Sequence, residues 1–156
     1  MNLVNVKTGE RINGRISRLT KAQVKKLKGS KKFQFDWSLE EANEIYAIRE
    51  GGGNELLGLI SLTDIGEELR IHINLIESAI KHQGENKEID GIPGCLIGFA
   101  CEMAFKKGYD GFVSLTPKTR LVNYYHEKFG FLQMGRNMVV FQEIAQSIIL
   151  KYLKNE

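Results

Sequence analysis

Two segments of the chain combine residue types that can bind phosphate or move protons. The first, DGIPGCLIGFA at residues 90–100, is a glycine-rich loop that opens an apolar helix. Glycines let a phosphate approach the backbone N–H groups closely, and the positive end of the helix dipole strengthens the attraction. Pro93 has no N–H, although it suits a first helical turn. The remaining donors would be those of Gly91, Gly94 and Cys95, which predicts a phosphate site.

The second segment, YYHEKFGF at residues 124–131, places two phenols and one imidazole within a single helical turn. Tyr124, Tyr125 and His126 are each able to donate a proton to a leaving group. A purely structural alternative stays open, in which Tyr125 packs against Phe129 one turn later and His126 is exposed to solvent.

One carboxylate stands where a base would be useful. Glu77 lies near the end of an alternating, strand-like pattern at residues 69–78. A carboxylate at the end of an apolar strand is able to act as a general base, directly or through a water molecule. The alternative is an ordinary strand-end glutamate that faces water. His72, on the polar side of the same pattern, is expected at the surface.

No set of side chains predicts a metal site or a covalent nucleophile. The histidines, His72, His82 and His126, are scattered, and two cysteines on one helix do not complete a ligand set. Cys95 and Cys101 are six residues apart on different faces of that helix, so we expect no disulfide and two buried small side chains. The helix N-terminus would lower the pKa of Cys95, but the sequence places no histidine beside it.

The composition is that of an ordinary globular protein. The 156 residues are 42% hydrophobic and 26% charged, which favours one domain over residues 1–156. No apolar run is long enough to span a bilayer and the N-terminus lacks a signal-peptide core, so we expect a cytoplasmic protein. Residues 1–32 carry ten basic residues and one acidic residue, whereas the whole chain has a net charge of +3. That basic end fits a solvated surface, and it would also suit an acidic partner, nucleic acid or nucleotide.

The patterning predicts an antiparallel meander followed by alternating helices and strands. Thr20 caps a helix over residues 21–28, and Ser38 begins an acidic helical turn. Expected strands cover residues 45–49, 56–62, 69–78, 112–115 and 134–141. Expected helices cover residues 94–107, 120–129 and 142–153. This order predicts an α/β layered fold with a mixed, mostly antiparallel sheet and helices on both faces.

The order and spacing over about residues 45–141 resemble the GNAT superfamily of N-acetyltransferases. YYHEKFGF is similar to the family's helix-to-strand sequence Leu-Tyr-Glu-Lys-Leu-Gly-Phe, with His126 at the tyrosine position. The glycine loop is similar to the family's Gln/Arg-x-x-Gly-x-Gly/Ala loop, with Glu88 and Pro93 as departures. Several shorter runs resemble a less familiar branch of small bacterial acetyltransferases: FDW at 35–37, GLISL at 58–62, LIE at 75–77 and LTPKT at 115–119.

The resemblance implies acetyl-CoA as co-substrate, held between splayed strands at residues 69–78 and 112–115. It implies direct attack of an amine on the thioester, with the oxyanion held by a backbone N–H near a strand bulge. Glu77 is then the expected base, and one of Tyr124, Tyr125 and His126 the expected acid. The expected contacts with acetyl-CoA are Leu75, Ile76, Ser78, Lys87, Gly91, Ile92, Gly94, Cys95 and Thr119.

The acceptor is left open as a small-molecule or peptide amine, because acceptor pockets in this fold are built from variable loops. Phe33, Phe35 and Trp37 either wall that pocket or pack in the core. We expect no membrane partner, the sequence disfavours nucleic acid, and a homodimer remains an option.

Two other functions fit the same fold. The departures at Glu88, Pro93 and His126 would suit a CoA-binding or regulatory interaction module without catalysis. The lysine-rich stretch at residues 21–32 would suit an RNA-directed acyltransferase, which ranks lower because the stretch has few aromatic residues for stacking.

Overall fold

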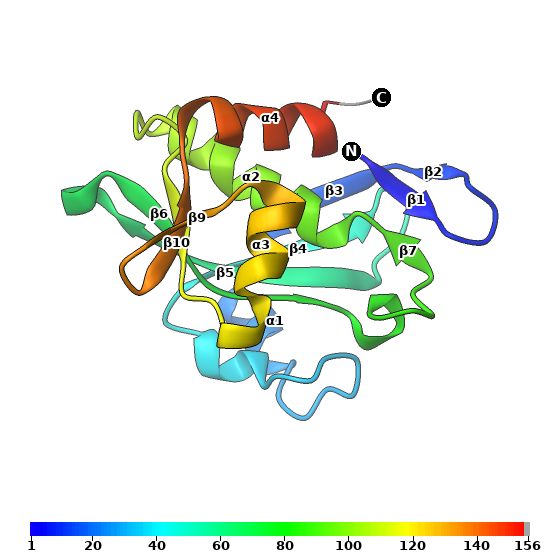
Figure 1. The fold of residues 1–156 in the computed structure, drawn as a ribbon. Helices are drawn as coiled ribbons and strands as arrows, with labels where there is room; N and C mark the ends of the chain where they lie inside the picture. Colours follow the sequence, from blue (N-terminus) through cyan, green and yellow to red (C-terminus); the bar gives the residue numbers. More distant parts are fainter. Residues whose placement is uncertain (155–156) are drawn as a thin grey trace.

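The computed structural model describes residues 1–154 as a seven-stranded sheet with helices on both faces (Figure 1). The strands lie in the order β3-β4-β5-β6-β8-β10-β9, and each neighbouring pair is antiparallel except β6 and β8. These strands are β3 (Gly14–Arg18), β4 (Glu44–Glu50), β5 (Leu56–Ile65), β6 (Arg70–Ser78), β8 (Val113–Leu115), β9 (Leu132–Met134) and β10 (Asn137–Val140). The predicted mixed, mostly antiparallel sheet is confirmed.

A second, three-stranded sheet ties the N-terminus to the segment that precedes the central helix. It has the order β2-β1-β7, with β1 at Leu3–Asn5, β2 at Arg11–Ile12 and β7 at Ile89–Asp90. The helices are α1 (Lys21–Lys25), α2 (Ile92–Lys106), α3 (Val122–Phe129) and α4 (Gln142–Tyr152), and short 3-10 turns include η1 (Trp37–Glu40), η3 (Ile80–His82) and η4 (Thr119–Leu121). Among residues 1–154, no helix has the length and apolarity needed to cross a membrane.

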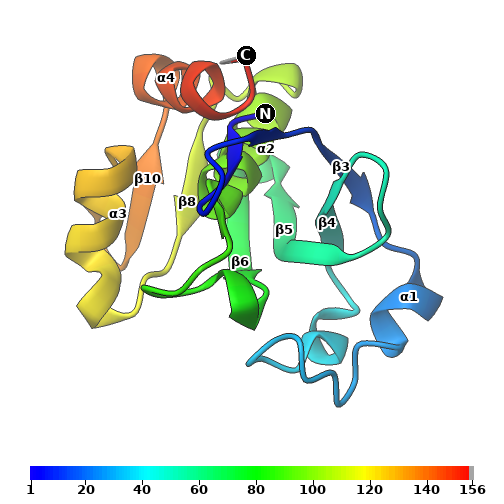
Figure 2. The same ribbon diagram turned by 90° about the vertical axis from the view of Figure 1, so that its right-hand side faces the viewer.

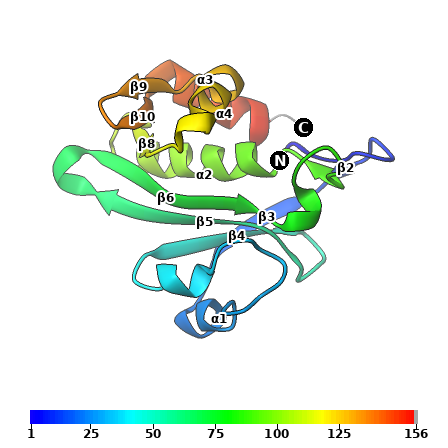
Figure 3. The same cartoon turned by 60° about the horizontal axis from the view of Figure 1, so that its bottom comes forward.

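The large sheet separates two apolar cores. Helices α2 and α4 lie on one side of it and α1 on the other (Figure 3). On the α2 side the strands contribute alternate residues such as Ile60, Ile71 and Ile73. On the α1 side, Leu59 and the fully buried Trp37 belong to the smaller core. Alternation of side chains along each strand supplies both cores at once.

Helix α2 is the centre of the larger core because its sequence is apolar around most of its circumference. Leu96, Ile97, Ala100 and Cys101 are all fully buried in it. Helix α4 packs directly on α2, and Gly94 permits this, since a Cβ there would collide with the Tyr152 ring. The close approach places the end of α4 beside the start of α2.

Strand β6 continues well beyond its neighbour β8. The parallel pairing joins Ile71–Ile73 to Val113–Leu115, and β6 then runs on to Ser78 with no strand on that side (Figure 2). On the other side, β5 pairs with β6 along its length, with a bulge at Asn74 between the pairs Ser61↔Leu75 and Leu62↔Ile73. The predicted divergence of these two strands is therefore present.

Three local predictions need correction. Asp36, not Ser38, caps the acidic turn: its Oδ1 accepts the Ser38 N–H at 3.1 Å, and the turn is the 3-10 helix η1. The helix expected over 21–28 ends at Lys25, although Thr20 caps it as predicted, in a capping box with Gln23. The strand expected over 134–141 is a hairpin, because Gly135 takes a positive φ of 64° and turns the chain between β9 and β10.

Candidate functional site

A cavity of about 540 Å³ opens where β6 has lost β8 as a neighbour. Its walls are the second half of β6, the segment from η3 to the start of α2, helix α3 and the end of α4. We call it the β6 cavity. Of the residues singled out in the sequence, it brings together Ile76, Glu77, Ser78, Lys87, Gly91, Gly94 and Tyr124. The lining does not include Leu75, Ile92, Cys95, Thr119, Tyr125 or His126.

The open edge of β6 presents main-chain groups to this cavity. The N–H of Ala79, just past the strand, donates to Leu57 O in β5 at 2.8 Å. Because successive strand residues direct their N–H groups to opposite edges, those of Ile76 and Ser78 point to the edge that β8 leaves open. The Ser78 carbonyl on that edge accepts a hydrogen bond from Gln83 Nε2 at 2.6 Å. An N–H donor for an oxyanion is thus available two residues after the bulge.

Glu77 is buried, with 6% of its surface exposed, so it is not a strand-end glutamate facing water. Oε2 accepts from the Gln34 N–H at 2.6 Å and from Gln83 Nε2 at 3.3 Å. Oε1 accepts from Trp37 Nε1 at 2.9 Å and from the Phe35 N–H at 3.3 Å. A carboxylate has about four lone-pair sites, so these donors occupy them all. The geometry makes Glu77 the anchor of the loop at residues 34–37, and its role as a base stays a prediction.

The three candidate acids on α3 have different surroundings. The Tyr124 side chain lines the β6 cavity, and burial together with Tyr152 and Asp90 raises the pKa of its phenol. Tyr125 packs edge-on against Phe131, and burial raises its pKa to about 12. A raised pKa keeps a phenol protonated at neutral pH, so Tyr124 combines a proton with access to the cavity.

His126, which the sequence resemblance aligns with a tyrosine, is exposed and turned toward the following loop. Its Nδ1 lies 2.9 Å from the Phe131 carbonyl oxygen, which requires the Nδ1–H tautomer as donor. This bond holds the imidazole at the C-terminal end of α3. The structural alternative raised by the sequence therefore describes His126 well.

The lining of the cavity carries three lysines and two carboxylates. Lys87, Lys128 and Lys151 all line it, from the η3–β7 segment, α3 and α4 respectively. Lys87 Nζ forms an ion pair with Asp90 Oδ1 at 2.9 Å, and Lys151 Nζ lies 5.2 Å from the Tyr152 ring centre. Lysines that converge from three elements suit a polyanionic group. The sequence reasoning missed two of them: Lys128 lies inside the YYHEKFGF segment, whereas nothing local marks Lys151.

His82 is a second residue that the sequence did not single out for this site. Its side chain lines the cavity, its exposed fraction is 5%, and within the described chain neither ring nitrogen has a hydrogen-bond partner. Burial and the nearby Lys81 lower its pKa, which favours the neutral ring with one donor and one acceptor. Buried polar groups are almost always satisfied, so a ligand or water is expected to complete this one.

The start of α2 differs from the simple picture of a phosphate loop. A Cβ on Gly91 would collide with the Asn2 carbonyl oxygen, and its φ of +99° also requires glycine. The glycines therefore serve chain packing, although Gly91, Pro93 and Gly94 still form part of the cavity wall. The Cys95 N–H is already bonded to the Gly91 carbonyl at 3.0 Å. Burial raises the pKa of the Cys95 thiol to about 11, so the expected lowering by the helix is wrong.

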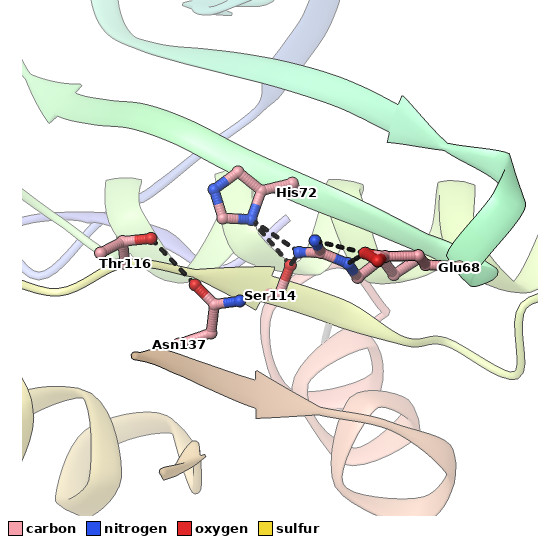
Figure 4. A network of polar contacts seen from close by, with 6 residues as sticks. Glu68, His72, Ser114, Thr116 and Asn137 are labelled. Carbon is pink, nitrogen blue, oxygen red and sulfur yellow. Dashed lines mark hydrogen bonds and ion pairs between the residues drawn. The ribbon is translucent and has the colours of Figure 1, made fainter. Parts of the chain in front are cut away.

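The first half of β6 carries polar side chains that satisfy one another (Figure 4). Ser114 Oγ lies 2.8 Å from His72 Nδ1 and accepts a hydrogen bond from Arg70 Nη1 at 2.6 Å. Arg70 also forms an ion pair with Glu68 at 2.6 Å. Burial and Arg70 lower the pKa of His72. His72 is half-buried, not a simple surface residue, and it belongs to a closed network outside the cavity.

No protein-family model matches the sequence, and a search of curated proteins gives no match either. Solved structures do match. Mutant forms of the spermidine/spermine N-acetyltransferase SpeG from Vibrio cholerae superpose with a TM-score of 0.62 at 16% identity, over 86% of this chain and 97% of that one. Ard1 from Thermoplasma volcanium gives 0.61 at 12% identity, over 84% and 99%. The IAA acetyltransferase from Bacillus cereus gives 0.56 at 17% identity, over 81% and 96%.

These structures are N-acetyltransferases of the GNAT superfamily, and they cover most of the present chain with the same arrangement of helices and strands. The divergence of β6 from β8, the bulge at Asn74 and the cavity beside them agree with the resemblance noted in the sequence. The chain has the GNAT N-acetyltransferase fold.

Proposed function

We propose that the protein transfers an acetyl group from acetyl-CoA to a primary amine, by direct attack while both substrates are bound. The observation that carries the proposal is the β6 cavity, where an open strand edge, a protonated phenol and three lysines meet. We further propose that residues 1–156 act as one acyltransferase domain in the cytoplasm.

The lining of the cavity suits acetyl-CoA, whose thioester is the activated acyl donor. Lys87, Lys128 and Lys151 would face its phosphates, and the open edge of β6 at Ser78, beyond Ile76, would hydrogen-bond to its amide groups as a strand would. The unpartnered ring of His82 gives independent support, because it needs a polar group from a ligand or water.

The residues of the chain would divide the catalytic work. The Ile76 N–H on the open edge would hold the developing oxyanion. Tyr124 would give its proton to the departing thiolate, since its raised pKa keeps the phenol protonated. Glu77 would fix the loop at residues 34–37 beside the acceptor. A fully bonded carboxylate favours transfer of the amine proton to a water molecule that this loop orients, and from it to bulk solvent, not directly to Glu77.

The acceptor is proposed only by class, as a small-molecule or peptide amine. SpeG is named for spermidine and spermine, whereas other matching structures have different names, so the fold does not select one acceptor. Gln34 and Phe35 line the cavity from the loop that Glu77 anchors, and we expect this loop to contribute to selection.

The test is release of free CoA thiol from acetyl-CoA in the presence of a panel of polyamines, amino acids and peptides. We expect amine-dependent release with at least one class. Tight acetyl-CoA binding without release from any amine would favour the non-catalytic module. Release that requires RNA and falls steeply with salt would favour the RNA-directed alternative.

A further inference from the structure

A second hollow, of about 350 Å³, lies on the α1 side of the sheet between β3, β4 and α1. We call it the arginine cleft. All of its lining residues carry hydrogen-bond donors and none is acidic: Arg15, Ser17, Arg18, Gln23, Arg49 and Asn54. It shares no lining residue with the β6 cavity. A concave surface that carries three arginines and no acidic residue has the chemistry of an anion site.

Two of the arginines are placed directly opposite each other. Arg15 on β3 pairs in register with Arg49 on β4. Like charges in such a cross-strand pair destabilise the sheet. Burial and the charge of Arg15 lower the pKa of Arg49. Stability alone therefore does not explain why both positions are arginine.

The contacts of these side chains fix their orientation without neutralising them. Arg15 Nη2 donates to Gly53 O at 2.8 Å, and Arg49 Nε donates to Asn54 O at 3.2 Å. Each guanidinium has five N–H donors, so both keep donors beyond these bonds. The carboxylate in contact with this group is Glu44, 3.6 Å from Arg18, and it also accepts the Tyr46 hydroxyl at 2.8 Å.

We propose that the arginine cleft binds the phosphate group of a small phosphorylated ligand, at a site separate from acyl transfer. Guanidinium groups match phosphate oxygens with paired N–H donors, and the preformed carbonyl contacts reduce the entropy lost on binding. The volume lies at the lower end of the range for small-molecule sites, which suits one phosphate group with a compact organic part. Occupancy would also relieve the repulsion between Arg15 and Arg49.

The test follows the arginine side-chain N–H signals by NMR during a titration with inorganic phosphate, at constant ionic strength set with sodium chloride. We expect saturable, single-site shifts of the Arg15, Arg18 and Arg49 signals. Arg49→Lys keeps the charge but loses the paired donors, so it is expected to weaken phosphate binding about tenfold or more. The matched control is Arg136→Lys, an exposed arginine in the β9–β10 turn, which should bind phosphate as the wild type does.

Several outcomes would overturn the proposal. NMR shifts that grow linearly with phosphate concentration at all arginines would mean non-specific attraction. Phosphate binding by Arg49→Lys as tight as that of the wild type would mean the same. If a single-stranded oligonucleotide shifts the signals of these arginines and inorganic phosphate does not, the cleft binds nucleic acid and the proposed small ligand is wrong. Arg15→Lys gives a second variant if Arg49→Lys does not fold. Because acetyl-CoA binding and thiol release are measured separately, failure here leaves the proposed acyl transfer untouched.

Discussion

The two halves of β6 have the same backbone conformation but opposite chemical situations. Along Ile71–Ile73 the strand has a neighbour on each side, and the side chains of Arg70 and His72 close a network with Ser114 (Figure 4). Along Leu75–Ser78 the strand has β5 on one side only. There the main chain faces a cavity, and the buried polar groups include the ring of His82, which has no hydrogen-bond partner within residues 1–154.

The difference arises from β8, which has only three residues. It ends at Leu115, two residues before Pro117, and a proline has no N–H to continue a ladder. A short, proline-terminated strand thus leaves the second half of its longer neighbour with an unpaired main-chain edge beside the β6 cavity. The comparison indicates that the unpaired main chain of β6 marks the candidate site more clearly than any one side chain does.

The largest effect is expected from Tyr124→Phe, in the cavity beside the open half of β6, which is the part at Leu75–Ser78 without β8 as a neighbour. Loss of the phenolic proton should lower kcat about 10²–10³-fold, with acetyl-CoA affinity little changed. Tyr125→Phe should retain most activity, because that ring packs on Phe131 outside the cavity. Steady-state thiol release measures both. Equal losses in the two variants, or a greater loss in His126→Gln, would move the acid to a different residue.

Glu77→Gln comes next, and it acts on stability. The new amide group would face N–H donors from Gln34, Phe35 and Trp37, so the free energy of unfolding should fall by about 2–4 kcal/mol. Trp37 is the only tryptophan, so its fluorescence during denaturant unfolding reports the change. Glu127→Gln on the exposed side of α3 is the control, expected within about 0.5 kcal/mol of wild type. An unchanged midpoint for Glu77→Gln would contradict the anchor role.

The closed half of β6 is the part that pairs with β8. There, Ser114→Ala should lower the free energy of unfolding by about 1–2 kcal/mol, since it removes one partner from both Arg70 and His72. Acetyl-CoA binding should be unaffected, because none of these residues lines the β6 cavity. Denaturant unfolding and calorimetric titration separate the two quantities. Weaker acetyl-CoA binding in this variant would show that the halves of β6 are not independent.

The smallest effect is expected from pH. Burial, with Arg70 at His72 and Lys81 at His82, lowers both pKa values below the ordinary 6.5, while Glu55 and Glu88 partly oppose this at His82. The unfolded chain then binds protons more readily than the folded one. Stability should therefore be full above about pH 6.5 and decline as pH falls from there toward the folded pKa values. Thermal unfolding of wild type and His72→Gln over this range checks the sign, and a flatter profile is expected for the variant.

Local patterns were enough to predict the framework but not the selection of site residues. The helix cap at Thr20 follows from local capping preferences. The spacing of apolar residues likewise predicts the positions of β4, β5, β6 and α2, because both signals depend on residues that are close in the sequence. Tyr124 could not be separated from His126 in this way, because both lie within one turn and only packing decides which faces the cavity.

The remaining site residues depend on contacts that are distant in the chain. Three of the four donors to Glu77 come from Gln34 to Trp37, about forty positions earlier, and Lys151 reaches the cavity only through the packing of α4 on α2. The glycines at the start of α2 line the β6 cavity, but the close approach of Asn2 and Tyr152 also requires them, so their role toward phosphate stays a prediction. Such requirements arise from tertiary packing, and the periodicity of apolar residues gives no information about contacts between distant parts of the chain.

The central claim is that the open half of β6 binds acetyl-CoA, and thermal unfolding with and without acetyl-CoA tests it most directly. At about one hundred times its Kd the ligand should stabilise the protein by about 2.7 kcal/mol, which raises Tm by roughly 5–10 °C. Ser114→Ala should show the same rise from a lower starting Tm. No rise in the folded wild-type protein would contradict the account, whereas the expected rise in both proteins would show that the protein binds acetyl-CoA and that this binding does not depend on Ser114.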